Sequence, residues 1–429
     1  MNVPALDSSA SDSLLLLAFA LLLIAPLAIA GVALINTGLG RSRSAAQSLL
    51  GSIAIAAVSV IGFAVLGSVF AGSARSVAIH AAGRDWDVLG LGPWIFRGAT
   101  TATPQTQLGL LFECMAAGMA ALIPWGAGAD RLRLAAGCAI AVVLAVILFP
   151  MLAHWVWGGG WLAGLHSNFD ADAGFVDTAG ASVVHVLGGL SALAVIWITG
   201  PRKGKFPREG LATAMPGHNA VYVLFGCFVA LVGWLAWNAA GAILWVRAPA
   251  SALPLTAINT LLSASAALVA TLAVTRLRFG KPDASLCANG WLAGLVTSSA
   301  CAAVVSPGAA FFTGAVTGIF TPLLVEVLEL ALSIDDPSGA IGVHLVSGLW
   351  GLAAAGLFAP QKGQLIAQLL GIAALMGFFL PLVYLLFALL NRIVAFRVDA
   401  DGERLGMDLH ELGGGAYPEF VIHRDESYR

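Results

Sequence analysis

Two short stretches, VVHVLGGL at residues 183–190 and GVHLVSGL at residues 342–349, share the pattern V-H-x-x-x-G-L, and this internal repeat decides the fold. Each stretch lies in a long apolar segment, the fifth and the tenth of eleven along the chain. A half with five crossings reverses the orientation of the next half in a membrane, which is the inverted-repeat architecture. The repeat axis then brings His185 and His344 together near the middle of the bilayer.

The composition restricts the class of protein just as strongly. Of the 429 residues, 59% are hydrophobic and only 10% are charged, whereas soluble domains carry about 25% charged residues. So few charges cannot cover a soluble globule, and a net charge of −2 provides no basic stripe for nucleic acid. A soluble enzyme, a disordered regulator and a nucleic-acid-binding protein are therefore excluded, and the expected surroundings are a lipid membrane.

The apolar segments are long enough to cross a bilayer as helices, at about 20 residues per crossing. We therefore predict an all-α polytopic membrane protein with eleven transmembrane helices, arranged as two inverted five-helix repeats plus a final helix. The membrane domain is expected over residues 1–390 and a C-terminal tail over residues 391–429. The expected spans are 14–35, 48–70, 108–125, 134–153, 179–200, 218–244, 253–275, 288–305, 309–333, 340–358 and 364–390.

Lysine and arginine residues are divided unequally between the two sets of loops, which predicts the orientation. Sixteen of the 21 lie in the loops and tail of one side, and the other five are Arg75, Arg84, Arg97, Arg247 and Lys362. We expect the basic side to be cytoplasmic, with the N-terminus outside the plasma (cell inner) membrane and the C-terminus inside. The segment 14–35 is expected to be a first transmembrane helix, because no basic residue precedes it; a cleaved signal peptide is the alternative.

Two histidines in apolar helices are unusual, because ionisable side chains inside a membrane are costly and commonly line a pathway. Neutral imidazole both donates and accepts hydrogen bonds, so His185 and His344 in contact can pass a proton or hold a small solute. A zinc site is not indicated, because no third ligand has suitable spacing. A haem held between the histidines is the alternative, but nothing in the sequence resembles a macrocycle pocket. We expect no cofactor and no metal.

Several separated motifs carry a resemblance to a known family. From about Leu14 to Tyr417 the chain resembles ammonium transporters of the Amt/Rh family. The motifs are AHWVWGGGW at 153–161, Asp177 eight residues before His185, GPRKG at 200–204, GKP at 280–282, DDP at 335–337, GVH at 342–344 and GMDLHE at 406–411.

The resemblance implies a transporter that is not an enzyme: a homotrimer with one hydrophobic pore per subunit. Aromatic faces in an outer vestibule would attract ammonium by cation–π interaction. The desolvated cation would lose its proton before passage, and His185 and His344 would handle that proton. Potassium would be rejected because it cannot deprotonate. By the same likeness, the tail packs under the pore and is a candidate contact for a P-II-type regulatory protein.

Individual positions match the family unevenly. His185 and His344 match the twin histidines, Asp177 matches the structural aspartate near the vestibule, and Trp157 matches the aromatic residue of the cation site. Phe112 matches the outer phenylalanine of the third span. In the sixth span, Trp234 and Asn238 keep part of the family motif.

Other positions depart from the family pattern. Trp237 replaces the gate phenylalanine, Gly241 replaces the serine of the cation site, and Ala116 stands at the position of the inner gate phenylalanine. Glu113 stands where the family often has glutamine, and Gly339 where an aspartate is usual. Glu113 is expected either to attract cations in the vestibule or to be bonded locally near a helix end or at a subunit contact.

The departures leave two functions open. Ala116 and Trp237 together are consistent with a compensated gate in an ammonium transporter. The alternative is an ammonium sensor or a non-conducting relative with altered solute specificity.

Overall fold

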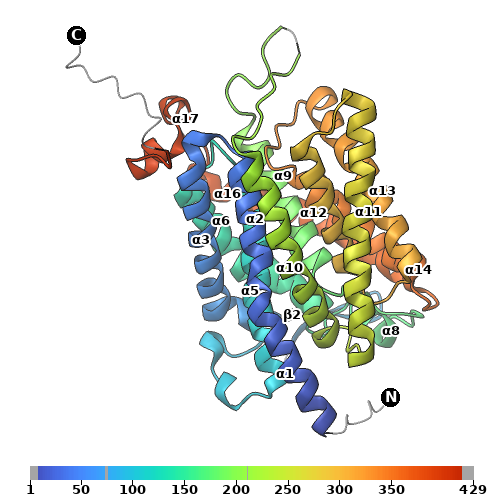
Figure 1. The fold of residues 1–429 in the computed structure, drawn as a ribbon. Helices are drawn as coiled ribbons and strands as arrows, with labels where there is room; N and C mark the ends of the chain where they lie inside the picture. The colour runs from blue at the N-terminus through green and yellow to red at the C-terminus, as the bar shows by residue number, and fades with distance from the viewer. Residues whose placement is uncertain (1–7, 73–75, 210, 418–429) are drawn as a thin grey trace, which may run out of the picture.

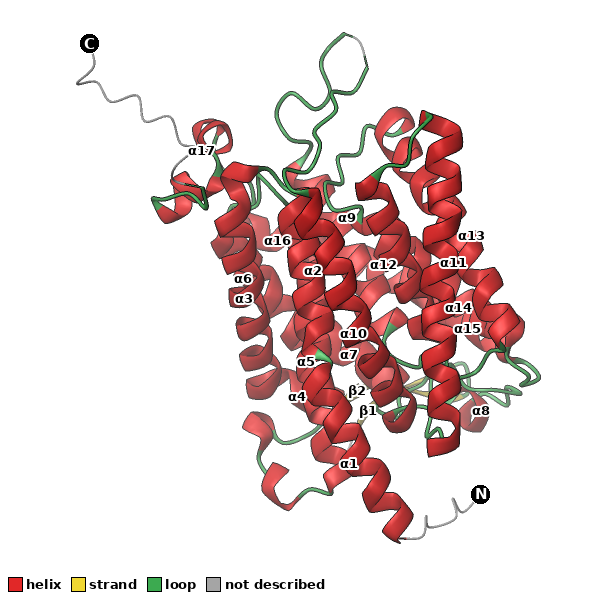
Figure 2. Ribbon diagram, viewed as in Figure 1, coloured by secondary structure: helices red, strands yellow, loops and turns green. Residues whose placement is uncertain are grey.

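The computed structural model describes residues 8–72, 76–209 and 211–417. These residues form a bundle of long helices that lie side by side (Figures 1 and 2). The start of α1 (Ser8–Ile24) and the short helix α17 (Ala400–Leu405) lie at opposite ends of the bundle, as an odd number of crossings requires (Figure 1). We call these ends the N-side and the C-side.

The elements follow one another along the chain, with a long loop between Thr199 and Ala220. The other helices are α2 (Pro26–Leu39), α3 (Ala45–Gly62), α4 (Ser68–Ala71), α5 (Pro104–Ala127), α6 (Leu134–Val143), α7 (Phe149–Val156), α8 (Leu165–Asn168), α9 (Leu187–Thr199), α10 (Ala220–Leu244), α11 (Leu253–Phe279), α12 (Ala284–Cys301), α13 (Pro307–Glu326), α14 (Ser347–Phe358), α15 (Gln364–Ala374) and α16 (Leu380–Ile393). The π-helical segments are η2 (Phe63–Gly67), η5 (Leu144–Leu148), η6 (Ala181–Val186), η8 (Val327–Ala331), η9 (Ile341–Val346), η10 (Leu375–Phe379) and η11 (Asp408–Leu412). The 3-10 turns are η1 (Ser42–Ser44), η3 (Trp94–Phe96), η4 (Ala99–Thr101) and η7 (Ala250–Ala252).

Ten helical stretches of the described residues are long and apolar enough to cross a membrane, and they correspond to ten of the eleven expected spans. The remaining expected span, 288–305, is helix α12, which has 18 residues. It is less apolar because it carries polar residues such as Asn289 and Ser298, both buried. Helices α10, α11, α13 and α14 pack against α12. A helix enclosed by protein needs no lipid-facing surface, so its lower apolarity is compatible with a crossing.

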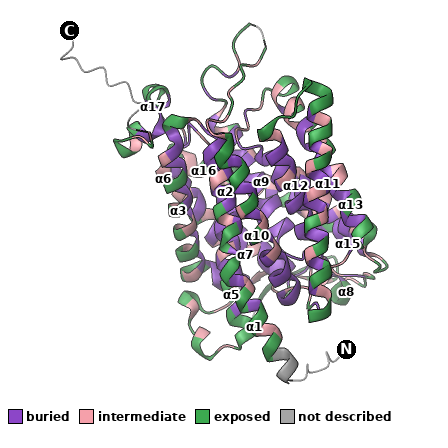
Figure 3. Cartoon of the chain, viewed as in Figure 1, coloured by how far each residue is buried: buried purple, intermediate pink, exposed green. Residues whose placement is uncertain are grey.

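Apolar side chains cover the outside of the bundle as well as its interior. Figure 3 shows buried residues along the inner faces of the helices and exposed residues along their outer faces. Many of the exposed residues are large and hydrophobic, among them Leu23, Ile53, Phe228, Val269 and Ile366. Such a surface suits lipid or contact with other subunits rather than water.

A β-hairpin lies at the N-side, where the sequence analysis expected only helices and loops. Strands β1 (Ser76–Ala81) and β2 (Arg84–Gly90) pair in antiparallel fashion. The hairpin is fixed to the end of α7: Asp87 Oδ1 lies 3.0 Å from His154 Nε2, and Trp155 Nε1 donates a hydrogen bond to the Val88 carbonyl over 2.8 Å. The all-α class therefore describes the membrane-spanning part, and the hairpin covers one edge of it.

The two histidine-bearing helices begin alike. In each, a six-residue π-helical segment that contains the histidine, η6 or η9, runs directly into a regular helix, α9 or α14. An aspartate, Asp177 or Asp336, stands eight residues before the histidine. The sequence analysis recognised Asp177 but did not pair it with Asp336, which lies at the same 159-residue offset as the histidines.

Both aspartates bond to peptide groups at the start of these segments. The carboxylate of Asp177 accepts hydrogen bonds from the backbone N–H of Gly180, Ala181 and Ser182 and from the Ser182 hydroxyl, over 2.5–2.8 Å. The carboxylate of Asp336 accepts from the backbone N–H groups of residues 340 and 341 at 3.0 and 2.8 Å. First-turn N–H groups have no partner within their own helix, so these carboxylates satisfy them.

The two halves cross in a reciprocal manner. A Cβ atom added at Gly189, four residues after His185, would lie 2.6 Å from the backbone of Leu345. A Cβ added at Gly348, four residues after His344, would lie 2.8 Å from the side chain of Val186. Each glycine thus packs on the residue that follows the other histidine, which is the pattern of a pseudo-two-fold contact. Small residues at these two positions let the helices approach closely.

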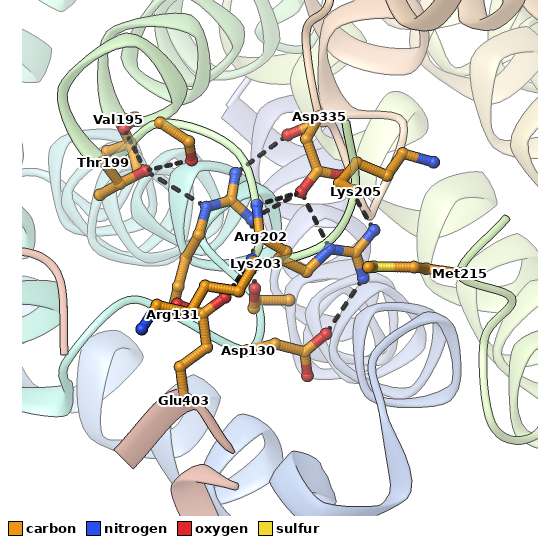
Figure 4. A network of polar contacts seen from close by, with 12 residues as sticks. Asp130, Arg131, Val195, Thr199, Arg202, Lys203, Lys205, Met215, Asp335 and Glu403 are labelled. Carbon is orange, nitrogen blue, oxygen red and sulfur yellow. Dashed lines mark hydrogen bonds and ion pairs between the residues drawn. The ribbon is translucent and has the colours of Figure 1, made fainter. Parts of the chain in front are cut away.

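A buried ion cluster holds the C-side of the bundle together (Figure 4). Arg202 lies between two carboxylates: its Nη1 is 3.1 Å from Asp130 Oδ2, and its Nε and Nη2 donate to Asp335 over 3.0 and 2.9 Å. Arg131, which is fully buried, donates from Nη2 to the Asp335 carbonyl over 2.9 Å. The cluster joins the connections before α6, after α9 and before η9, so it fixes the segment from which the His344 helix begins.

The C-terminal segment closes the same side. The Asp408 carboxylate accepts hydrogen bonds from the N–H groups of Ala46 and Gln47 at the start of α3, and Glu411 accepts from Leu134 N at the start of α6. Carboxylates stabilise helix N-termini, where the helix dipole is positive. The division of the chain at residue 390 stays a prediction.

We expect Asp177→Ala to destabilise the protein by about 2–4 kcal/mol, because four hydrogen bonds to a buried carboxylate are lost at the start of the His185 helix. Thermal unfolding in detergent measures the change. Asp172→Ala is the matched control, since that exposed aspartate lies in the same loop 3.8 Å from Lys362. Equal unfolding temperatures for the two variants would contradict the capping role.

Stability should also fall in acid. Burial raises the pKa of Asp335, but hydrogen bonds from Arg202 and the charges of Arg131 and Arg202 outweigh it, so this pKa lies below its usual value of 3.8. A carboxyl group whose pKa is lower in the folded protein than in the unfolded protein contributes its full stabilisation at pH values above the pKa of the unfolded state. That contribution is lost as the pH falls through the pKa of the folded state.

The unfolding temperature of the wild type should therefore drop below about pH 4. Asp335→Asn should lower stability at neutral pH and flatten the acid-dependent drop, whereas Asp401→Asn, at an exposed position, should change neither. An acid profile of Asp335→Asn as steep as that of the wild type would show that the drop has another origin.

Candidate functional site

The two repeat-related histidines meet inside the bundle. Nδ1 of His185 and Nδ1 of His344 are 3.2 Å apart, and the two rings stack with centroids 5.2 Å apart and an interplanar angle of 20°. Both side chains are buried, with 1% and 4% of each residue exposed. A hydrogen bond at this distance requires one Nδ1 to carry a proton and the other to accept it. The expected meeting of the pair is thus present in the structure.

Trp234 forms one wall beside this pair. Its ring stacks on His185 with centroids 5.2 Å apart and an angle of 14°, and its Nε1 donates to the Ser299 hydroxyl over 2.8 Å. Ser299 belongs to α12, so the less apolar helix of the bundle supplies the acceptor that orients this indole. A buried indole N–H needs such a partner.

Four aromatic rings form a cluster on the N-side of the histidines. Phe112 lies at its centre, with ring centroids 4.7 Å from Trp237, 5.6 Å from Trp157 and 5.7 Å from Trp245. Trp157 and Trp245 stack face to face at 4.7 Å and 6°. Phe112, Trp157 and Trp237 were predicted from the sequence to belong to the site, whereas Trp245 was not.

The missed tryptophan follows a helical spacing. Trp234, Asn238, Gly241 and Trp245 are separated by four, three and four residues, which is the period of one helix face. This stripe was the available signal for Trp245. At about 1.5 Å per residue, Trp245 lies roughly 16 Å further along α10 than Trp234, so the two indoles lie at different depths between the N-side and the histidines.

A cavity of about 500 Å³ opens on the N-side of the aromatic cluster. Trp157 and Trp245 line it, together with Glu113 of α5 and with Arg97 and Arg247. Phe112 and Trp237 are fully buried and do not line the cavity. The cavity therefore ends at the aromatic cluster, and the Phe112–Trp237 contact separates it from the histidine pair.

Three further residues named from the sequence occupy packing positions. Ala116 is fully buried on α5, one turn beyond Phe112. Gly241 packs on the segment before η6, and an added Cβ would lie only 2.4 Å from the Thr178 carbonyl oxygen. Asp177 bonds to peptide groups, as described above, and does not line the cavity. A serine at position 241 would thus need the backbone to move.

The segment between Asp177 and η6 joins these parts. Trp237 Nε1 donates to the Ala179 carbonyl over 2.8 Å, and Trp157 Nε1 donates to the Asp177 carbonyl over 3.1 Å. Ala179 N in turn donates to the Ser299 carbonyl over 2.8 Å. Two rings of the aromatic cluster are therefore oriented by the same short segment that carries the cap of the His185 helix.

The described residues offer no group of three or more His, Cys, Asp or Glu side chains arranged to hold a metal ion. What the site presents is a cluster of aromatic rings on the N-side of two imidazoles. Aromatic faces attract cations, and imidazoles exchange protons and hydrogen bonds.

Comparisons with known proteins agree on one family. The model of the Ammonium Transporter Family matches residues 14–417. Ammonium transporter Amt2 of Archaeoglobus fulgidus is 32% identical over 427 residues, which cover 92% of this chain and 86% of the relative. Ammonium transporter 1 member 1 of Oryza sativa is 31% identical over 360 residues, which cover 76% of this chain and 72% of the relative.

Solved structures show the same fold. A Sensor Amt Protein matches with a TM-score of 0.83 at 27% identity, covering 93% of this chain and 98% of that chain. Mep2 of Saccharomyces cerevisiae matches with a TM-score of 0.77 at 23% identity, covering 90% of this chain and 89% of that one, a likeness that concerns the fold alone. With a family match over nearly its whole length, this polytopic membrane protein belongs to the ammonium transporter family.

Proposed function

We propose that the protein conducts ammonium or ammonia across the membrane along a path past the aromatic cluster and the two histidines. The observation that carries this proposal is the buried contact between His185 and His344, 3.2 Å apart between their Nδ1 atoms. Neither Nε2 atom has a hydrogen-bond partner among the described residues. Both remain able to bond to a passing solute.

Deprotonation before passage is part of this proposal. The aromatic faces that border the cavity attract a cation, but the buried Phe112–Trp237 contact leaves no room for its hydration shell. Desolvation disfavours the charged form of an amine, so ammonium gives up its proton and neutral ammonia proceeds. The proton passes separately by way of the imidazoles, which both accept and donate. Potassium cannot follow this route because it has no proton to lose.

The assembly and its location follow from surface chemistry. We infer a homotrimer with one path per subunit, for which the exposed apolar faces of the outer helices provide contact area. We infer the plasma (cell inner) membrane, with the N-side outside, because the C-side carries most of the lysines and arginines. On this view the segment from residue 391 is cytoplasmic and is the surface for a P-II-type regulatory protein.

An ammonium sensor is the second candidate function. The likeness to a Sensor Amt Protein at 27% identity supports it. The close packing of Phe112 on Trp237, with ring centroids 4.7 Å apart, also supports a sensor, because it separates the cavity from the histidines. Ammonium-dependent current in proteoliposomes distinguishes the candidates, since a pure sensor carries none.

We expect His185→Ala or His344→Ala to lower ammonium-dependent current by about a hundredfold or more, the size of a lost acid–base contribution. The measurement is current from purified protein in proteoliposomes. His80→Ala, on the exposed β-hairpin, is the matched control and should leave the current unchanged. Full current in both histidine variants would rule out proton handling by the pair.

Trp237→Ala should raise ammonium flux several-fold and admit potassium, because the indole that contacts Phe112 is removed. Flux of labelled methylammonium and of a potassium analogue into vesicles measures both effects. Trp197→Ala is the control, since that indole is half exposed on α9 and contacts Tyr384. Unchanged flux and selectivity would mean that Trp237 does not gate the path.

A further inference from the structure

One face of α5 lines the N-side cavity. The lining residues from this helix are Gln105, Thr106, Gly109, Leu110 and Glu113, which recur at the three- and four-residue spacing of a single helix face. Glu113 is the furthest of them from the start of the helix and lies directly after Phe112. Its carboxyl group therefore stands at the inner end of the cavity, beside the aromatic cluster.

The carboxyl group of Glu113 is buried and has no protein partner. Only 7% of the residue is exposed, and no hydrogen bond or ion pair to it is present among the described residues. Such a group in an apolar setting is costly unless a counter-charge reaches it. The two arginines that line the same cavity, Arg97 and Arg247, are both exposed and form no ion pair with it. The unpaired acceptor therefore faces the space that a solute would enter.

The surrounding groups suit a small cation with N–H donors. Trp157 and Trp245 line the cavity and offer ring faces to positive charge. Among the described residues that line this cavity, no side chain other than that of Glu113 is acidic. Glu113 is thus the acidic side chain of this cavity that can accept a hydrogen bond from such a cation.

We propose that Glu113 binds the ammonium ion in the N-side cavity by accepting its N–H hydrogen bonds. The proposal rests on the proposed function, in which ammonium enters from this cavity. It extends to protonated small amines such as methylammonium, which keep N–H donors. Rim arginines weaken the attraction only from a distance, because exposed charges are screened by salt.

Glu113→Gln tests the proposal, because it keeps the shape and removes the charge. The concentration of ammonium chloride that gives half-maximal current should rise about 10- to 100-fold, the loss expected for a charge-assisted hydrogen bond. The maximal current should change much less. Glu113→Asp should retain much of the affinity. Glu326→Gln is the control, since Glu326 pairs with Arg278 and does not line the cavity.

A second measurement separates this proposal from the proposed function. Ammonium chloride is titrated against the tryptophan fluorescence of each purified variant in detergent, with sodium chloride as the ionic-strength control. A loss of ammonium affinity in this titration that is confined to Glu113→Gln supports the proposal, even if no variant carries current. In that case only the proposed transport function fails. If the wild type conducts and Glu113→Gln keeps its half-maximal concentration in both measurements, the proposal is overturned and transport stands.

An internal ion pair is the competing explanation for Glu113. If Arg97 or Arg247 moved inward to neutralise it, Arg97→Gln or Arg247→Gln would expose the carboxylate and tighten ammonium binding strongly. Binding that is unchanged in Glu113→Gln but tightened in an arginine variant would overturn the proposal. Binding weakened by Glu113→Gln and nearly unchanged by the arginine variants would support it.

Discussion

The peptide N–H groups at the start of the two histidine helices constrain much of the structure. These helices begin inside the protein, where water cannot satisfy their first donors. Asp177 and Asp336 supply the acceptors at equivalent positions of the two halves. Because each cap stands eight residues before its histidine, it also fixes the depth at which that imidazole lies. The histidine contact therefore depends on two carboxylates that do not touch the path.

The neighbouring ion cluster extends this constraint to the C-side. Asp335 precedes the cap Asp336 directly and accepts hydrogen bonds from Nε and Nη2 of Arg202. Removing one partner from a buried ion pair commonly costs about 3–5 kcal/mol, since the other charge is left uncompensated. The cluster ties the connections of both halves to one position. The segment from which the His344 helix begins is thus held by the Asp336 cap and by the neighbouring cluster.

Much of this arrangement could be predicted from the sequence, for a physical reason. Apolar length and the V-H-x-x-x-G-L repeat indicated the bundle and the meeting of His185 with His344, because a membrane allows few structures for such segments. The β-hairpin at 76–90 could not be predicted in the same way. Its strands are short, β1 is exposed along its whole length, and the hairpin is held by a few contacts between residues distant in the sequence, such as Asp87 with His154.

The site residues divide along the same line. Phe112 and Trp157 were named from their match to the family motifs. The role of Gly241 could not be predicted in this way, because it depends on a close contact with the backbone of residue 178, which is distant in the sequence. Trp245 lies on the same helix face as Trp234, Asn238 and Gly241, a spacing that is present in the sequence but is not part of the family motif. Distant contacts of this kind need the fold before they can be recognised.

The substitutions at the gate are best understood together. Trp237 is larger than phenylalanine and has an N–H donor, which it uses on the Ala179 carbonyl. Gly241, one turn further along α10, lets that helix approach the same segment. The close approach and the hydrogen bond depend on each other, since a larger residue at 241 would push Ala179 away from the indole. The small side chain of Ala116 does not open a gap at this point, because the rings of Phe112 and Trp237 are in direct contact, with centroids 4.7 Å apart.

The Trp237 indole is therefore tied to the segment that carries the Asp177 cap, and moving it would require a hydrogen bond next to that cap to break. In the proposed function, a Trp237 ring held in this way favours a narrow, dehydrated passage over a gate formed by a mobile side chain. Dehydration is the condition under which an ammonium ion is separated from its proton. The same dehydration disfavours an isolated charge on the buried Glu113 carboxyl group at the inner end of the cavity, so a bound cation would stabilise it.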